Sequence, residues 1–139
     1  MVLAGKLHPL LIHFPIALVL VAAMAELVAT MTNSRDWHVV AVTNLRAGAV
    51  LAVGAAIVGW LLASAPGVEP SATLEWHRWL GTTAAIAAAA AALATGGADG
   101  PSERTRWIYR TALFGAAACV ALTGHLGGIL VWGADFLRP

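Results

Sequence analysis

The fold of this chain is decided by the apolar segment at residues 9–31, PLLIHFPIALVLVAAMAELVATM. Its length matches the roughly 20 residues that a helix needs to cross ~30 Å of hydrocarbon at about 1.5 Å per residue. It is longer than the apolar part of a secretory signal, and its Met24-Ala25-Glu26 stretch is not a convincing cleavage site for a signal peptidase. We therefore predict a retained membrane-spanning helix.

Three further apolar segments follow, at about residues 43–64, 76–95 and 107–133. Polar or Pro/Gly-rich breaks separate the four segments, at residues 32–36, 64–70 and 96–102. Such breaks are typical of turns, and short turns make sequential helices antiparallel neighbours. The sequence thus predicts an all-α fold, an integral membrane four-helix bundle of up-down-up-down topology that forms one domain over residues 1–139.

The composition supports a membrane protein and excludes several other classes. Of 139 residues, 60% are hydrophobic and 11% are charged, which is too little charge to cover the surface of a small soluble domain. The net charge of +1 and the lack of a basic stripe argue against nucleic-acid binding. The single cysteine, Cys119, excludes an intrachain disulfide and a CxxC site. With no G-x-S-x-G, Walker or H-E-x-x-H motif, catalysis is the weakest functional hypothesis.

Four histidines gather at one end of the predicted bundle, namely His8, His13, His77 and His125. At about 1.5 Å per residue, His13 lies about 6 Å below the start of the first segment and His125 about 10 Å below Trp132. Imidazoles are costly in a bilayer, so several at one depth indicate a ligand set for haem or a metal ion. We predict His13, His77 and His125 as the ligand pool of one haem b, with His8 supporting them or completing the pair of a second haem.

Small residues flank these histidines. Gly81 follows His77 by one turn, and Gly124 and Gly128 lie near His125. A porphyrin needs such space to pass close to helix backbones, whereas a bare ion does not. Glycine also lets membrane helices pack closely without any cofactor, so both interpretations stay open.

The sequence also predicts the contacts of three further polar residues. Arg78 is a candidate to bind a haem propionate, since a guanidinium offers paired donors to a carboxylate, and contact with lipid headgroups is an equal alternative. Glu26 is expected to pair with Arg46, because an unpaired carboxylate in a membrane is expensive. His38, at the opposite end, is expected to be an ordinary surface residue.

The distribution of basic residues predicts the orientation. Five of them lie on the side of the connections at residues 32–46 and 96–110, and three on the other side. The richer side is expected to be cytoplasmic. We therefore expect a multi-pass protein of the bacterial cytoplasmic membrane with both termini, and the histidine end, on the periplasmic face.

The opening motif resembles a known family. LHPLLIHFPIAL at residues 7–18 is similar to the pattern H-P-x-x-x-H-F-P-I-A of the DUF2231 family of small bacterial membrane proteins. The likeness extends to WHRWLG at 76–81 and TGHLGGILV at 123–131, and so covers nearly the whole chain. The resemblance implies a four-helix membrane domain, which other proteins carry beside c-type cytochrome or Rieske modules. Relatives add a histidine after the last motif that VWGAD at 131–135 lacks, which weakens the case for a second haem.

These features predict a b-type cytochrome-like subunit that transfers electrons between a periplasmic redox protein, c-type cytochrome or Rieske-like, and quinone or a partner complex. Two imidazoles close both axial positions of the iron, which favours electron transfer. One alternative is a copper, zinc or non-haem iron site held by the same histidines. Another is a structural or assembly subunit of a respiratory complex. Small-residue stripes facing membrane lipid indicate a homodimer or docking to a larger membrane complex.

Overall fold

The computed structural model describes residues 2–95 and 102–135, and the side chains of residues 11–95 and 102–135. It contains four helices, α1 (Val2–Thr32), α2 (Arg35–Ala63), α3 (Ala72–Ala94) and α4 (Glu103–Trp132). The described residues include no strand. The predicted all-α four-helix bundle is confirmed.

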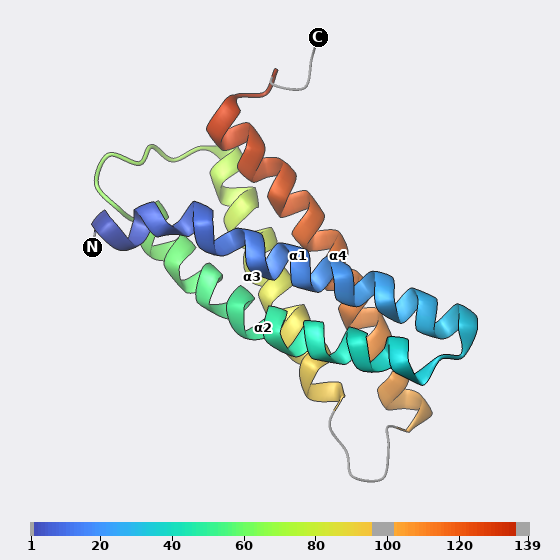
Figure 1. Ribbon diagram of the computed structural model, residues 1–139. Helices are drawn as coiled ribbons and strands as arrows, with labels where there is room; N and C mark the ends of the chain where they lie inside the picture. The colour runs from blue at the N-terminus through green and yellow to red at the C-terminus, as the bar shows by residue number, and fades with distance from the viewer. Residues whose placement is uncertain (1, 96–101, 136–139) are drawn as a thin grey trace.

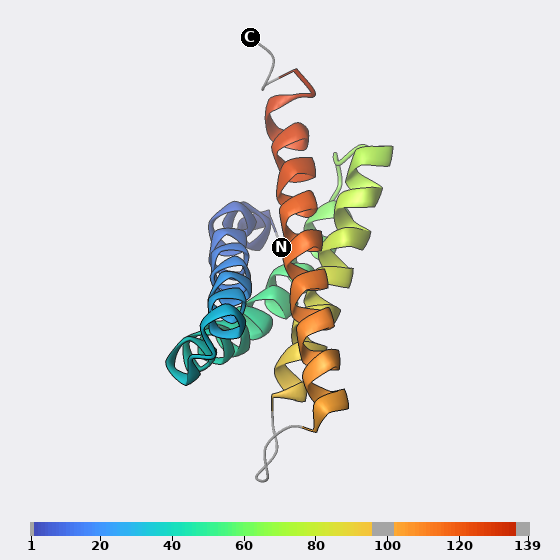
Figure 2. The same cartoon turned by 90° about the vertical axis from the view of Figure 1, so that its right-hand side faces the viewer.

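The helices are arranged as two antiparallel hairpins. The most extensive contacts are those of α1 with α2 and of α3 with α4, while smaller contacts of α2 with α3 and of α1 with α4 join the two pairs. Figure 1 shows the α1–α2 pair crossing the α3–α4 pair at a steep angle, and Figure 2 shows the crossing from the side. The start of α1 and the end of α4 therefore diverge, and the histidine end of the bundle is splayed.

The turn between α1 and α2 is shorter than expected, because α2 begins at Arg35 and not near residue 43. The Ser34 side chain caps α2 by accepting a hydrogen bond from the backbone N–H of Trp37 at 3.5 Å, and Asp36 lies in the first turn, where the helix dipole favours an acid. Asn33 adopts a φ of 51°, a left-handed conformation that asparagine tolerates. The polar residues predicted as a connection thus start a helix.

The core of the bundle is built mainly from small side chains. Its buried members are Val19, Ala22, Ala23, Leu45, Ala49, Ala84, Ala88, Ala91, Tyr109, Leu113, Ala116 and Val120. Small residues let helix backbones approach closely. The approach is tight at Gly48, where an added Cβ would lie 3.1 Å from the Cβ of Leu18 and 3.1 Å from Cγ2 of Val19.

Three helical segments are long and apolar enough to cross a membrane: Leu11–Thr32, Arg35–Ala63 and Glu103–Trp132. Large apolar side chains cover much of the outer surface, among them Met24, Met31, Ile57, Leu93 and Val131. A soluble protein rarely exposes so much contiguous apolar surface. Helix α3 is not among the three segments, because its first turns are polar and most of the rest is alanine. The protein is a helical membrane bundle.

Candidate functional site

His77 is the predicted ligand whose geometry is best defined. Its side chain is partly buried between α3 and α4, and Nδ1 lies 3.0 Å from the carbonyl oxygen of Thr123. A carbonyl only accepts, so Nδ1 carries the proton and donates it, and Nε2 keeps its lone pair. Gly127 packs against the ring, since a Cβ there would lie 3.2 Å from Cε1 of His77. The backbone of α4 thus fixes both the tautomer and the orientation of this imidazole.

The three predicted glycines differ in their surroundings. Gly81 faces α4, where an added Cβ would lie 3.4 Å from Cγ2 of Thr123, so its small size serves the packing of the two helices. Gly124 has nothing within 4 Å of the position that a Cβ would take. Gly128 is partly buried. Of Gly81 and Gly124, only Gly124 has free space beside it within the described part of the chain.

His125 does not share the face of α4 that contacts His77. The residues of α4 that contact His77 are Thr123 and Gly127, and His125 is two residues from each of them. At about 100° per residue, its side chain leaves the helix about 200° away from theirs. It is exposed. The α4 helix therefore separates the imidazole of His125 from that of His77.

His13 likewise lies on an outward face. Pro15 and Val19 are buried positions of α1, and His13 is two residues before Pro15 and is exposed. His8 lies outside the residues whose side chains the structure describes. Among the described residues, no three histidine, cysteine or acidic side chains lie close enough together to hold a metal ion. The structure therefore places His77 at a helix contact and both His13 and His125 on the outer surface.

Arg78 points toward α2. Its Cζ lies 3.7 Å from the centroid of the Trp60 ring, within the range of a cation–π contact. Trp60 in turn donates from Nε1 to Oγ1 of Thr82 at 2.9 Å, and its ring meets that of Trp79 edge to face at 5.5 Å. The Nε atom of Arg78 is buried and has no hydrogen-bond partner among the residues that the structure describes. The guanidinium is thus held in place by packing while one of its donors stays unused.

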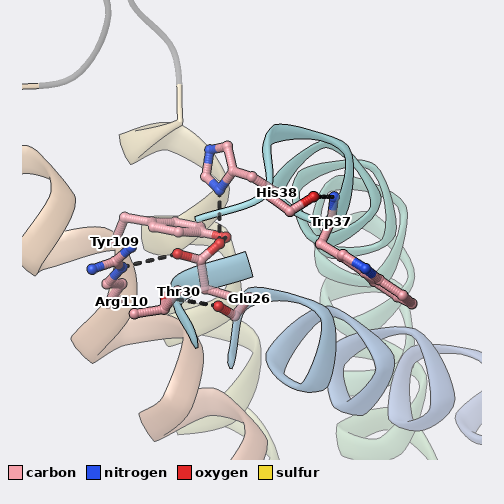
Figure 3. A network of polar contacts seen from close by, with 7 residues as sticks. Glu26, Thr30, Trp37, His38, Tyr109 and Arg110 are labelled. Carbon is pink, nitrogen blue, oxygen red and sulfur yellow. Dashed lines mark hydrogen bonds and ion pairs between the residues drawn. The ribbon is translucent and has the colours of Figure 1, made fainter. Parts of the chain in front are cut away.

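A second polar cluster lies at the other end of the bundle, around Glu26. This carboxylate is fully buried. Figure 3 shows three side chains converging on it: Oε1 accepts from Nε of Arg110 at 2.9 Å, and Oε2 accepts from the Tyr109 hydroxyl at 3.0 Å and from Nδ1 of His38 at 2.7 Å. Both carboxylate oxygens of Glu26 therefore have hydrogen-bond partners. Residues from α1, α2 and α4 are joined at this point.

Two sequence predictions at this end are wrong. Glu26 does not pair with Arg46, whose Nε donates instead to Oγ1 of Thr95 at 3.1 Å. His38 is not an ordinary surface residue, because it binds Glu26. The reason is the early start of α2: in a hairpin that turns at Asn33, Glu26 faces the first turns of α2, where His38 lies, and Arg46 is about two turns further along. In the sequence, two features indicate the early start of α2: Ser34 is a suitable N-cap, and Asp36 follows in the first turn.

Comparison with known proteins gives one match. A family model described as a predicted membrane protein, DUF2231, matches residues 5–136. No curated protein and no solved structure matches the chain. The match covers both polar sites and all four helices, and it confirms the resemblance inferred from the motifs.

Proposed function

This chain belongs to the DUF2231 family of predicted membrane proteins, and we propose that it is an electron-transfer subunit that binds haem b at its histidine end, with His77 as one axial ligand. The hydrogen bond from Nδ1 of His77 to the Thr123 carbonyl, at 3.0 Å, carries the proposal. A histidine that ligates a metal almost always donates its other ring nitrogen to a carbonyl, carboxylate or water, which directs the remaining lone pair to the metal.

The second axial ligand comes from His8, His13 or His125. His8 remains in this ligand pool as the sequence predicted it, and its side chain lies outside those that the structure describes. His13 and His125 lie on outward faces, where a haem shared with a second copy of the chain or with another membrane subunit would meet them.

Two imidazoles would hold the haem, and the group would supply one-electron transfer and not oxygen chemistry. The proposed donors and acceptors are a periplasmic c-type cytochrome or Rieske-like protein on one side and quinone or a membrane complex on the other. The bias of basic residues supports a periplasmic histidine end. In this proposal α3 crosses the membrane together with α1, α2 and α4.

The absorption spectrum of the detergent-purified protein tests the proposal. After expression with ample haem supply, we expect a Soret band and a haem b signature in the pyridine haemochrome assay. His77→Gln should lower the haem content at least about tenfold, because an axial bond is lost. Glutamine keeps an N–H donor for the Thr123 carbonyl, so a folded variant without haem separates ligation from a purely structural hydrogen bond.

His38→Gln is the matched control, because His38 lies at the other end of the bundle and is outside the ligand pool. Its haem content should equal that of the unmodified protein. If the purified protein contained copper, zinc or iron but showed no Soret band, the site would hold a bare metal ion and not haem. A protein that holds neither haem nor metal, and in which His77→Gln changes nothing, would contradict the proposal and leave a structural or assembly subunit.

A further inference from the structure

A groove of about 730 Å³ runs between α2 and α3. On the α2 side its lining extends from Val53 to Ser64, and on the α3 side from Thr82 to Leu93, a span of eleven residue steps in each case. At about 1.5 Å per residue this is a length of about 16 Å, close to one leaflet of a ~30 Å hydrocarbon core. The walls are apolar, and the alanines of α3 leave the space open. The groove has the length and chemistry to hold a lipid acyl chain.

Arg78 and Trp60 stand at the end of the groove that faces the histidine side. Trp60 lines the groove and bonds to Thr82, another lining residue. Arg78 lies one turn before Thr82, with its guanidinium 3.7 Å from the Trp60 ring. Within the described part of the chain its buried Nε has no acceptor, which is a costly state for a guanidinium donor. Because this atom is enclosed, an anion would meet Arg78 through the nitrogens at the end of the guanidinium.

A second hollow, of about 390 Å³, lies beside the start of α3 and is lined by Pro70, Ser71, Glu75 and Arg78 among others. Glu75 and Arg78 are three residues apart and so lie on one side of α3. Neither side chain forms an ion pair within the described part of the chain. The hollow therefore presents one negative and one positive group to whatever occupies it.

We propose that these two spaces form a binding site for one molecule of phosphatidylethanolamine. Its acyl chain lies in the groove between α2 and α3, its phosphate accepts hydrogen bonds from Arg78, and its ammonium donates to Glu75. A guanidinium binds a phosphate through paired donors. A glycerol headgroup would leave Glu75 without a cation, a serine headgroup would add a second carboxylate beside Glu75, and a choline headgroup has no N–H to donate. The charges in the hollow thus select this headgroup.

The bound lipid also accounts for the composition of α3. This helix is not among the segments apolar enough to cross a membrane by themselves, yet it packs against α4 along its length (Figure 2). A permanently bound acyl chain would cover the alanine side of α3 that faces the groove. The site uses none of the histidines predicted to ligate haem, but it assigns to a lipid phosphate the Arg78 side chain that the sequence offered to a haem propionate.

Native mass spectrometry of the protein taken from nanodiscs tests the site. With equal amounts of phosphatidylethanolamine, phosphatidylglycerol and phosphatidylcholine in the bilayer, we expect one retained phosphatidylethanolamine. Arg78→Gln should reduce the retention of phospholipid about tenfold, because a charge-assisted contact is lost. Glu75→Gln should keep a bound phospholipid and lose the preference among headgroups. Arg104→Gln, an exposed arginine at the other end, should change neither.

Ala90→Trp provides a second approach, because Ala90 is exposed and lines the groove without contacting the headgroup hollow. A bulky ring there should displace the acyl chain while Arg78 and Glu75 stay intact. Equal retention of the three lipids, or retention that Arg78→Gln does not change, would overturn the proposal. So would a prenylated quinone retained in place of the phospholipid. Each lipid is identified by its mass, and the same spectra show whether haem is bound, so failure of the lipid site and failure of haem binding are distinguishable.

Discussion

Glu26→Ala is expected to lower the free energy of unfolding by about 3 kcal/mol, the typical cost of breaking a buried ion pair. The substitution removes the common acceptor of Arg110, Tyr109 and His38 and leaves a cavity where the carboxylate was fully buried. The estimate is at the low end of the range because the Arg110 side chain is 33% exposed and regains some solvation. Denaturant or thermal titration in detergent, followed by circular dichroism, measures the loss.

The neighbouring substitutions should follow an order. Glu26→Gln should cost less than Glu26→Ala, because the amide keeps the volume and one acceptor oxygen. His38→Gln should cost less than about 1 kcal/mol, since the His38 side chain is 42% exposed and exposed pairs contribute little. Glu69→Gln, in the exposed connection between α2 and α3, is the matched control. If Glu26→Ala were as stable as Glu69→Gln, the cluster would have no role in holding the helices together.

Gly48→Leu should cost about 2–3 kcal/mol, as overpacking of a tight interface does. An added Cβ at Gly48 meets Leu18 and Val19 at 3.1 Å, so a leucine there must push α1 away from α2. Gly54→Leu is the matched control on the same helix, because its Cβ would meet nothing within 4 Å and leucine is the better helix former. The same titration should show Gly54→Leu unchanged or slightly more stable. Equal losses in both variants would show that the close approach at Gly48 does not matter.

The number, order and approximate positions of the helices were predictable from the sequence, because a bilayer demands apolar segments of nearly fixed length. The start of α2 was not. The polar residues Arg35 and Asp36 look like part of a connection, but a serine cap and the helix dipole outweigh their polarity at the first turn. That difference of two turns decides which residue of α2 reaches Glu26.

The rotation of each helix about its own axis was the part that the sequence did not reveal. In a helix that is apolar on all sides, no polar face contrasts with an apolar one, so the sequence pattern does not show which face is buried. The depth of His13 and His125 follows from their positions in the chain, but their outward direction depends on which faces of α1 and α4 pack together. The bond from His77 to Thr123 is likewise a contact between two helices far apart in sequence. Ligation by these histidines stays a prediction.

The two-residue turn at Asn33 and Ser34 has a consequence for biosynthesis. Chains emerge from the ribosome with the N-terminal part first, and a connection this short obliges α1 and α2 to enter the lipid phase as one unit. His38 is translated before Tyr109 and Arg110, so we expect its bond to Glu26 to form first. The carboxylate would then be hydrogen bonded within its own hairpin before α4 adds the contacts that join the second hairpin to the first.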